Sequence, residues 1–224
     1  MPDPDFVYRY ERGSSATTLL LLHGTGGDEG DLLPLGRMLA PDASLLSPRG
    51  KVLESGMPRF FRRLAEGVFD VEDLVVRTHE LARFVRDATA HHALAAERII
   101  AAGFSNGANI AASVLLLHPG LLRGALLLRP MVPFEPETPP DLSGTAVLIV
   151  GGRDDPIVPQ RQTERLAEIL RDANADVSVQ WQAGGHGLTQ ADVSAGRRWL
   201  AGVDGDAGGA WPPASVDRNR ESRP

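Results

Sequence analysis

The segment G-F-S-N-G at residues 103–107 holds a serine in a pattern that can support nucleophilic chemistry. In G-x-S-x-G the serine occupies a sharp turn from a strand into a helix, and the glycines let these two elements pack closely. Residues 98–102 before it are apolar and partly β-branched, as in a buried parallel strand, whereas residues 108–117 are typical of a helix that ends before Pro119. Ser105 is therefore the candidate nucleophile of a serine hydrolase.

A serine nucleophile needs a base and an acid, and in hydrolases with this turn the chain order is Ser, then Asp or Glu, then His. The apolar run at residues 146–150 leads into G-G-R-D-D-P-I-V-P, so acidic residues follow the carboxyl end of a predicted strand. The alternating run at residues 177–181 leads into G-G-H-G, a flexible loop that presents His186. His186 is the candidate general base, which would take a proton from Ser105 and later return it to the leaving group.

Two adjacent residues, Asp154 and Asp155, are candidates for the acid that orients the histidine, and spacing alone does not choose between them. We favour Asp155 because it precedes Pro156, whose fixed φ would stiffen the loop. The alternative is that both aspartates belong to a solvated turn, which Asp-Asp-Pro forms readily.

Four other histidines fall on predicted helices or at their ends, namely His79, His91, His92 and His118. None has a second histidine or a carboxylate at metal-ligand spacing, so a surface role is the better interpretation. We predict no metal and no cofactor.

An acyl-transfer site also needs two N–H donors for the developing oxyanion. The backbone N–H of Asn106, directly after the serine, is one candidate. The apolar strand predicted at residues 17–22 runs into H-G-T-G-G, where the backbone N–H of Thr25 is the other candidate. This loop lacks the G-K-[ST] ending of a phosphate loop, and the acidic residues within 28–31 would repel phosphate. Those acidic residues suit the N-terminus of a following helix.

These motifs together resemble the phospholipase/carboxylesterase family of small α/β-hydrolases, which includes carboxylesterases and acyl-protein thioesterases. The similarity is to a bacterial branch with L-H-G-T-G-G, G-F-S-N-G-A, D-P-I-V-P and G-G-H-G-L in this order, some members of which are associated with hydroquinone or aromatic-compound stress. It extends over residues 8–200, and further similar segments lie at residues 19–22, 47–50, 57–61 and 131–133.

The resemblance implies a role for each matching residue. Ser105 would be the nucleophile, Asp155 the acid and His186 the base, while the N–H groups of Thr25 and Asn106 would form the oxyanion hole. The resemblance also strengthens the preference for Asp155 over Asp154. It also implies that the protein can form a homodimer.

Composition limits the remaining classes. A chain of 224 residues with 42% hydrophobic residues can bury one large core, and its net charge of -6 argues against a general nucleic-acid binder. Because the chain has no cysteine, disulfides and a cysteine nucleophile are excluded. The N-terminal residues lack a basic and an apolar signal region, and no apolar run approaches the roughly 20 residues of a membrane span. We therefore predict a cytoplasmic protein with no membrane span.

Apolar or alternating runs predict strands at residues 6–10, 17–22, 44–46, 98–102, 124–128, 145–150 and 177–181. Helical patterns between or after them lie at residues 71–89, 108–117, 159–173 and 188–201. This alternation predicts a doubly wound, mainly parallel sheet of about seven strands with helices on both faces, and it allows an antiparallel hairpin at the amino-terminal edge. Together with the family resemblance it implies the α/β-hydrolase fold without a large cap domain. We expect one domain at residues 1–201 and a flexible or loosely docked tail at 202–224, which contains Trp211.

The substrate pocket should be open, because no long insertion after the elbow could form a large cap. Residues 51–70 are the main irregular segment, and we expect apolar residues from it and from residues 131–133 to line an acyl or aryl pocket. The predicted lining consists of Met57, Phe60, Phe61, Phe69, Met131, Val132 and Pro133. Alternatively, the phenylalanines are core residues, and Arg59, Arg62 and Arg63 form a solvated face or attract anionic substrates.

The sequence as a whole predicts a serine carboxylesterase that hydrolyses small to medium esters through an acyl-enzyme on Ser105, without a cofactor. An acyl thioesterase or a lysophospholipase-type hydrolase would use the same residues. A non-catalytic ligand-binding protein on the same fold is the alternative from another class, and the complete set of Ser105, Asp155 and His186 argues against it.

Overall fold

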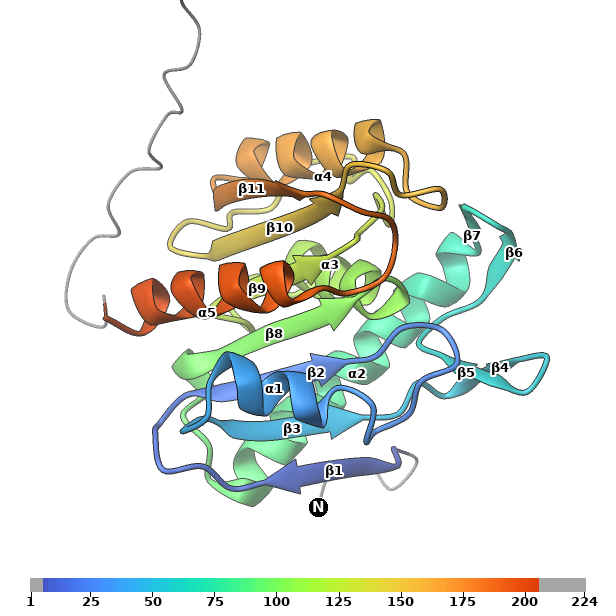
Figure 1. Ribbon diagram of the computed structural model, residues 1–224. Helices are drawn as coiled ribbons and strands as arrows, with labels where there is room; N and C mark the ends of the chain where they lie inside the picture. The colour runs from blue at the N-terminus through green and yellow to red at the C-terminus, as the bar shows by residue number, and fades with distance from the viewer. Residues whose placement is uncertain (1–5, 206–224) are drawn as a thin grey trace, which may run out of the picture.

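A seven-stranded sheet forms the centre of the computed structural model, which describes residues 6–205 (Figure 1). In chain order its strands are β1 (Tyr8–Glu11), β2 (Thr18–Leu22), β3 (Ser44–Pro48), β8 (Ile99–Phe104), β9 (Gly124–Leu128), β10 (Ala146–Gly152) and β11 (Asp176–Gln182). Across the sheet the order is β1-β3-β2-β8-β9-β10-β11. All neighbouring pairs are parallel except β1 with β3, so the predicted mainly parallel sheet is confirmed.

The amino-terminal edge differs from the predicted hairpin. β1 is antiparallel to its neighbour, but that neighbour is β3, with Tyr8 opposite Pro48. β2, the next strand in the chain, lies on the other side of β3. The apolar sequence of β2 explains this, because all five of its residues are buried and require an interior position in the sheet.

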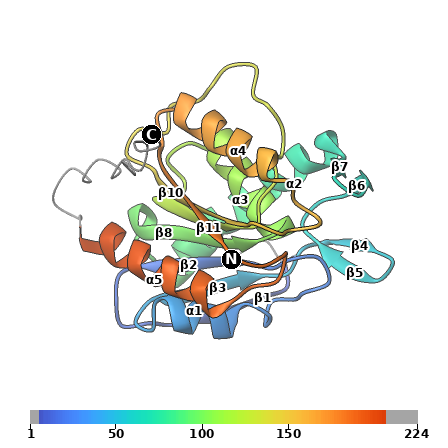
Figure 2. The same ribbon diagram turned by 45° about the horizontal axis from the view of Figure 1, so that its top comes forward.

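Helices cover both faces of the sheet, as predicted (Figures 1 and 2). α1 (Leu33–Leu39) and α5 (Gln190–Gly205) lie on one face, while α2 (Val71–His92), α3 (Asn106–Leu117) and α4 (Gln160–Asp172) lie on the other; a 3-10 turn, η1 (Ala96–Arg98), precedes β8. None of the helices within residues 6–205 is both long and apolar enough for a membrane crossing.

Alternate residues of the central strands supply two separate cores. Leu20 and Leu22 of β2 pack into the core beneath α2, α3 and α4, whereas Leu19 and Leu21 face the core beneath α1 and α5. Successive side chains of a strand point to opposite faces, so a strand covered on both sides is apolar throughout. The continuous Leu run of β2 thus fixes the centre of the sheet, next to the strand that carries Ser105.

The C-terminal helix extends beyond its predicted end. α5 continues to Gly205, although the sequence predicted a tail from residue 202. Val203 is buried in the core under α5, and this burial explains why the helix does not stop at Ala201. The remainder of the predicted tail, including Trp211, lies outside the described residues.

The irregular segment at residues 51–70 contains two short hairpins that the sequence pattern did not predict. β4 (Val52–Glu54) pairs with β5 (Met57–Arg59), and β6 (Arg63–Ala65) pairs with β7 (Val68–Phe69). Ser55 and Gly56, at the turn of the first hairpin, both have positive φ, as a tight hairpin turn requires. Figure 1 shows both hairpins beyond the carboxyl ends of β2 and β8.

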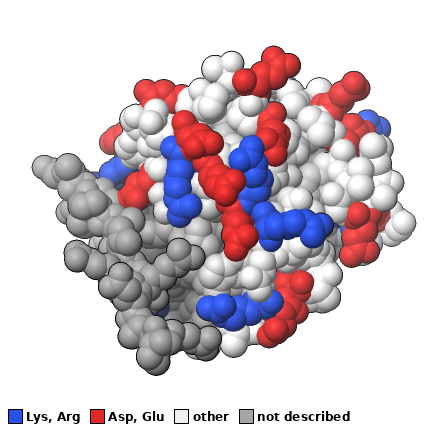
Figure 3. Space-filling view, turned by 90° about the horizontal axis from the view of Figure 1, so that it is seen from above, with Lys and Arg blue, Asp and Glu red and all other residues white. Residues whose placement is uncertain are grey.

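The face around α4 carries charges of both signs. Figure 3, which views the molecule from this side, shows basic and acidic side chains interspersed over its described part. On α4 itself Arg165 forms ion pairs with Glu135 at 2.6 Å and with Glu168 at 3.1 Å. This face therefore presents no broad region of a single sign.

Candidate active site

Ser105 occupies a strained turn between β8 and α3. Its φ of 52° and ψ of -114° are unusual for a residue with a Cβ. The turn is held by its backbone N–H, which donates to the carbonyl oxygen of Leu128 at 2.9 Å. A Cβ at Gly103 would lie 2.5 Å from the carbonyl oxygen of Gly107, and a Cβ at Gly107 would overlap the backbone of Leu22. Only glycine at these two positions allows α3 to begin this close to the sheet.

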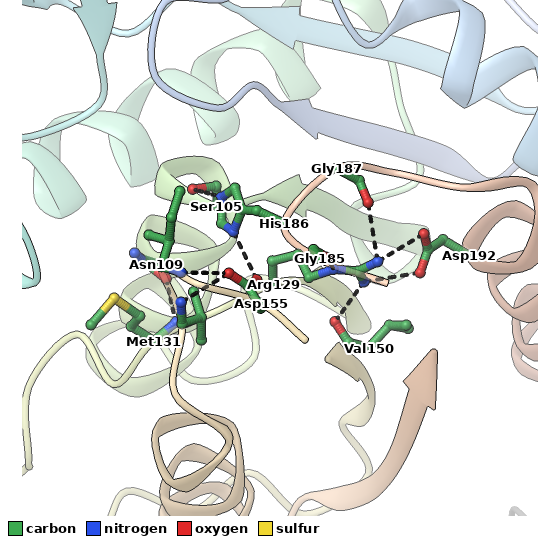
Figure 4. Close-up of polar contacts among 12 residues, drawn as sticks. Ser105, Asn109, Arg129, Met131, Val150, Asp155, Gly185, His186, Gly187 and Asp192 are labelled. Carbon is green, nitrogen blue, oxygen red and sulfur yellow. Dashed lines mark hydrogen bonds and ion pairs between the residues drawn. The ribbon is translucent and has the colours of Figure 1, made fainter. Parts of the chain in front are cut away.

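Three side chains from the ends of different strands form a hydrogen-bonded chain (Figure 4). His186 Nε2 lies 2.9 Å from Ser105 Oγ, and His186 Nδ1 lies 2.8 Å from Asp155 Oδ2. The side chain of Asp155 is 1% exposed and that of His186 is 18% exposed. In this arrangement Nδ1–H donates to the carboxylate, so Nε2 is free to accept from the serine hydroxyl.

In the loop after β10 the two candidate acids, Asp154 and Asp155, have different contacts. Asp155 Oδ1 accepts hydrogen bonds from the backbone N–H groups of Ile157 at 2.8 Å and Val158 at 3.0 Å, which fixes the carboxylate that faces His186. Asp154 is exposed, and its backbone N–H donates to the carbonyl oxygen of Gly184 at 3.0 Å. Of the two aspartates, Asp155 is therefore the one hydrogen bonded to the histidine.

Thr25 and Asn106, whose backbone N–H groups are the predicted oxyanion donors, line the same cleft as Ser105. The hydrogen bonds among residues 6–205 leave both N–H groups without an acceptor, whereas those of Gly26 and Gly27 donate to Pro58 and Gly24. The two predicted donors are thus available to an oxygen atom bound in the cleft.

A buried histidine that the sequence analysis did not single out shapes the loop after β2. His23 is 1% exposed, its Nδ1 lies 2.7 Å from the carbonyl oxygen of Gly24, and its Nε2 accepts from the N–H of Gly50 at 2.9 Å. Burial lowers the pKa of His23, so the imidazole is neutral with its proton on Nδ1. The H-G pair directly after a buried strand was the available signal for this residue.

The sequence predicts that the acidic residues within 28–31 lie at the N-terminus of a helix, but they do not occupy its first turn. α1 begins at Leu33 and has no acidic residue in its first turn. Asp28 instead accepts from the N–H of Gly30 at 2.7 Å within its own turn, and Glu29 forms an ion pair with Arg49 at 2.5 Å. The hydrogen bond from Arg49 lowers the pKa of the Glu29 carboxyl.

A cleft of about 260 Å³ opens at Ser105, a size near the lower end for small-molecule pockets. Of the predicted lining residues only Phe69 and Met131 border it. Its other lining residues include several that the sequence analysis did not place there, namely Arg59, Arg63, Glu66, Phe104, Asn109, Arg129, Ile157 and Val158.

Five predicted pocket residues do not border this cleft, contrary to the expectation. Phe60 and Phe61 are 3% and 0% exposed in the core on the α2 and α3 side, and Val132 packs against the same core. Met57 is 41% exposed on the β4–β5 hairpin, and Pro133 does not border the cleft. For Phe60 and Phe61 the alternative of core residues holds. Apolarity alone does not decide between a pocket and the core, because the direction of each side chain depends on the hairpins, which the pattern did not predict.

The three arginines of this segment have different surroundings. Arg59 is 3% exposed, donates to Thr25 Oγ1 at 2.7 Å and lies 3.2 Å from Glu54. Arg63 pairs with the same glutamate at 2.7 Å, whereas Arg62 is exposed and pairs with Asp70 at 2.9 Å. Only Arg62 fits the solvated face that the sequence suggested, and Arg59 supports the loop that carries Thr25.

The remaining histidines lie on α2 or directly after α3, as predicted, and none borders the cleft. His79 Nδ1 lies 2.9 Å from His118 Nε2, and the ring of His92 stacks on Tyr10. Within residues 6–205, no three histidine or carboxylate side chains gather in a way that could hold a metal ion.

The sheet order, the strained serine turn after β8 and the placement of the acid and histidine loops after β10 and β11 define an α/β-hydrolase. The family model described as Phospholipase/Carboxylesterase matches residues 9–201. The chain therefore belongs to the phospholipase/carboxylesterase family of hydrolases.

Individual relatives agree with this assignment. The chain is 54% identical over 190 residues to MhqD of Bacillus subtilis, covering 85% of this chain and 95% of that protein. The crystal structure of the Bacillus cereus carboxylesterase is similar with a TM-score of 0.86 and 46% identity, over 88% of this chain and 94% of that chain. A carboxylesterase from Mesorhizobium loti has a TM-score of 0.86 and 35% identity, over 90% and 97%.

Proposed function

We propose that this protein is a serine carboxylesterase that hydrolyses small to medium carboxylic esters through an acyl-enzyme on Ser105. The observation that carries the proposal is the chain of hydrogen bonds from Ser105 through His186 to Asp155. Nucleophile and base lie within hydrogen-bonding distance, and a third group orients the base, which is the arrangement that activates a serine hydroxyl. The two carboxylesterases of similar structure support the choice of esters.

In the proposed first half-reaction, Ser105 Oγ attacks the ester carbonyl while His186 Nε2 takes the hydroxyl proton. The carbonyl oxygen becomes an oxyanion, which the N–H groups of Thr25 and Asn106 stabilise, each worth roughly 3 to 4 kcal/mol. His186 then protonates the leaving alkoxide, and the acyl group stays on the serine. Asp155 holds the Nδ1–H tautomer and stabilises the imidazolium.

In the second half-reaction, His186 removes a proton from water, and the resulting hydroxide attacks the acyl carbon. A second oxyanion forms in the same position. When it collapses, the bond between the acyl carbon and Ser105 Oγ breaks, His186 returns its proton to Oγ, and the carboxylic acid is released. The partial exposure of His186, whose side chain is 18% exposed, provides a route for this water. All groups needed for both steps come from residues of the chain, so the proposal requires no cofactor.

The cleft favours an acyl group of modest size. Phe69, Met131 and Ile157 give it an apolar part, while Arg63 and Glu66 bring charges to its border. A cleft of about 260 Å³ accommodates a short acyl chain more readily than a long one. We therefore expect turnover to be highest with short-chain esters.

Hydrolysis of p-nitrophenyl esters of increasing chain length, with the matching acyl-CoA thioesters, tests the proposal. The wild type should hydrolyse short esters, and Ser105→Ala should lower kcat by about 10⁴-fold or more. Ser143→Ala is the matched control, because this serine is exposed and precedes the amino end of β10, at the opposite end of the strand from Asp155. It should have wild-type activity.

Three results would contradict the proposal in different ways. Equal inertness of wild type and Ser105→Ala on all substrates, with no labelling by a serine-directed fluorophosphonate, would favour a ligand-binding protein on this fold. Turnover of thioesters alone would replace the esterase by an acyl thioesterase. Activity that survives in Ser105→Ala would remove the serine from the mechanism.

A further inference from the structure

Arg129, the residue directly after β9, is a buried cation beneath the loop that carries His186 (Figure 4). Its side chain is 0% exposed. The guanidinium has five N–H donors, and each has an acceptor. Nε donates to the carbonyl oxygen of Gly185 at 3.1 Å, and Nη1 donates to that of Val150 at 3.2 Å. Nη2 donates to the carbonyl oxygen of Gly187 at 3.2 Å.

The second N–H group of Nη1 and that of Nη2 bind the carboxylate of Asp192, which lies in the first turn of α5. Nη1 lies 2.9 Å from Oδ1 and Nη2 lies 3.0 Å from Oδ2, a bidentate ion pair between two fully buried side chains. Asp192 Oδ2 also accepts from the N–H of Thr189 at 2.6 Å and from its hydroxyl at 2.8 Å. The start of α5 thus fixes the carboxylate, and the carboxylate fixes the guanidinium.

The two loop carbonyls that Arg129 binds belong to the residues on either side of His186. This loop is rich in glycine, and Gly184 has a φ of +109°, so its backbone would otherwise have wide conformational freedom. It also lies close against the end of β10, since a Cβ at Gly152 would be 2.5 Å from the carbonyl oxygen of Gly185. Both observations show that the position of the loop depends on contacts from outside it.

We propose that Arg129 and Asp192 are positioning residues for His186. The guanidinium holds the backbone on both sides of the histidine, so the imidazole stays between Ser105 and Asp155. This role rests on the proposed function, because it concerns the base of the same reaction. Neither side chain contacts Ser105, Asp155 or the imidazole itself among the described hydrogen bonds.

The ion pair of Arg129 and Asp192 is better explained by the loop conformation that it selects than by a gain in the free energy of unfolding. Replacing a buried ion pair by apolar residues of similar size is often neutral or stabilising, because two charges no longer have to be desolvated. The pair binds a loop that has no regular secondary structure and presents the histidine that must align with two partners. An apolar pair would fill the same space but could not bind the two carbonyl groups.

The first test compares the wild type with the double variant Arg129→Met and Asp192→Leu, which removes both charges and leaves neither one buried alone. With p-nitrophenyl acetate we expect kcat to fall about 100-fold, the effect of roughly 1 Å of misplacement, while KM stays within about three-fold. Labelling of Ser105 by a fluorophosphonate should slow by a similar factor, since it depends on the same base. Arg165→Met with Glu135→Gln is the matched control and should have wild-type kinetics, because it removes an exposed ion pair between α4 and the segment after β9.

A conservative variant separates positioning from folding. Arg129→Lys keeps a cation beside Asp192 but has fewer donors for the loop carbonyls, so we expect a melting temperature close to that of wild type and a kcat about ten-fold lower. Wild-type kcat in either folded variant would overturn the proposal. A raised KM with unchanged kcat would overturn it as well, because Arg129 would then act on the substrate.

Hydrogen exchange of the amides at residues 183–188 measures the positioning without turnover; Thr189 is left out because its own N–H donates to Asp192. The proposal predicts faster exchange in this loop in the double variant, with the sheet amides unchanged; equal exchange in the loop would overturn it. If the wild type proves inert towards every ester and thioester, the proposed function fails, while the exchange result still decides whether Arg129 holds the loop.

Discussion

The loops after β2 and after β11 both border the cleft at Ser105, but they are held in different ways. The loop after β2 combines an outside contact from Arg59 with a side chain of its own, because His23 binds Gly24 within the loop and Gly50 outside it. The loop after β11 is held from below by Arg129, which comes from another strand. Both loops are rich in glycine and lack regular secondary structure.

The difference follows from what each loop contributes. The loop after β2 is proposed to supply a backbone N–H, that of Thr25, so its side chains are free to act as internal supports. The loop after β11 is proposed to supply the side chain of His186, which cannot support the loop and take part in proton transfer. A loop that presents a reacting side chain therefore depends on supports from the rest of the fold.

Removing the reacting side chain of the second loop should have the largest effect. His186→Ala should lower kcat by about 10⁴-fold or more, because the base is lost, while the melting temperature changes little. His91→Ala, on an exposed part of α2, is the matched control. A loss below ten-fold in kcat, measured with p-nitrophenyl acetate, would show that another group acts as the base.

Displacing the loop after β11 without altering its residues should have the next largest effect on kcat. In Gly152→Ala the new Cβ would lie 2.5 Å from the carbonyl oxygen of Gly185 and 2.9 Å from that of Gly184, so the loop must move. We expect kcat to fall about 100-fold. A crystal structure of the variant should show a longer distance from His186 to Ser105; wild-type kcat would mean that the loop tolerates this movement.

The first loop should be less sensitive, because only a backbone group has to be aligned. Thr25→Val removes the hydroxyl that accepts from Arg59 and leaves the backbone N–H in place. We expect a decrease of about ten-fold in kcat, a fraction of what complete loss of an oxyanion donor costs. Thr25→Ser keeps the hydroxyl and should be within about two-fold of wild type. Equal kcat for the two variants would remove Arg59 as a support of the loop.

The smallest effect concerns the stability that His23 gives to the first loop. Burial lowers the pKa of His23 below the ordinary 6.5 and outweighs the hydrogen bond to Gly24 and the nearby charges of Asp31 and Asp28, which raise it. The unfolded chain binds a proton below pH 6.5 and the folded protein does not, so the free energy of unfolding should fall as the pH decreases from 7.5 through this value. Urea unfolding at a series of pH values between 7.5 and 5 measures this decrease.

A variant isolates this contribution from those of other histidines. Burial also lowers the pKa values of His92 and His118, which contribute to the pH dependence with the same sign. The dependence should therefore be smaller in His23→Asn than in wild type. An unchanged slope between pH 7.5 and 5 would show that folding does not lower the pKa of His23.

Much of the fold and the placement of the three proposed triad residues could be predicted from local patterns. The strands of a sheet covered on both faces are continuous apolar runs, and such runs are recognisable in β2, β9 and β10. Ser105 and Asp155 each follow a run of this kind, whereas His186 follows the alternating run of β11. The carboxyl ends of parallel strands meet at one edge of the sheet, which brings the three residues together. Their catalytic roles stay predictions.

The remaining features depend on contacts between distant parts of the chain. The strands at residues 52–69 have only two or three residues each, too few for a periodic pattern, and therefore the directions of Phe60 and Phe61 could not be predicted. Arg129 and Asp192 are 63 residues apart in the sequence, so their ion pair could not be predicted from either residue. An arginine next to a fully buried strand, and the T-x-x-D capping pattern at residues 189–192, were the only local signs of this pair.

The buried pair restricts how the sequence can change during evolution. Loss of either Arg129 or Asp192 alone leaves an uncompensated buried charge, at a cost of about 3 to 5 kcal/mol, which is a large part of the 5 to 15 kcal/mol that stabilises a typical domain. A lineage that exchanges one residue must pass through a protein that folds poorly unless the other changes with it. The two positions should therefore be inherited together or replaced together among descendants of this protein.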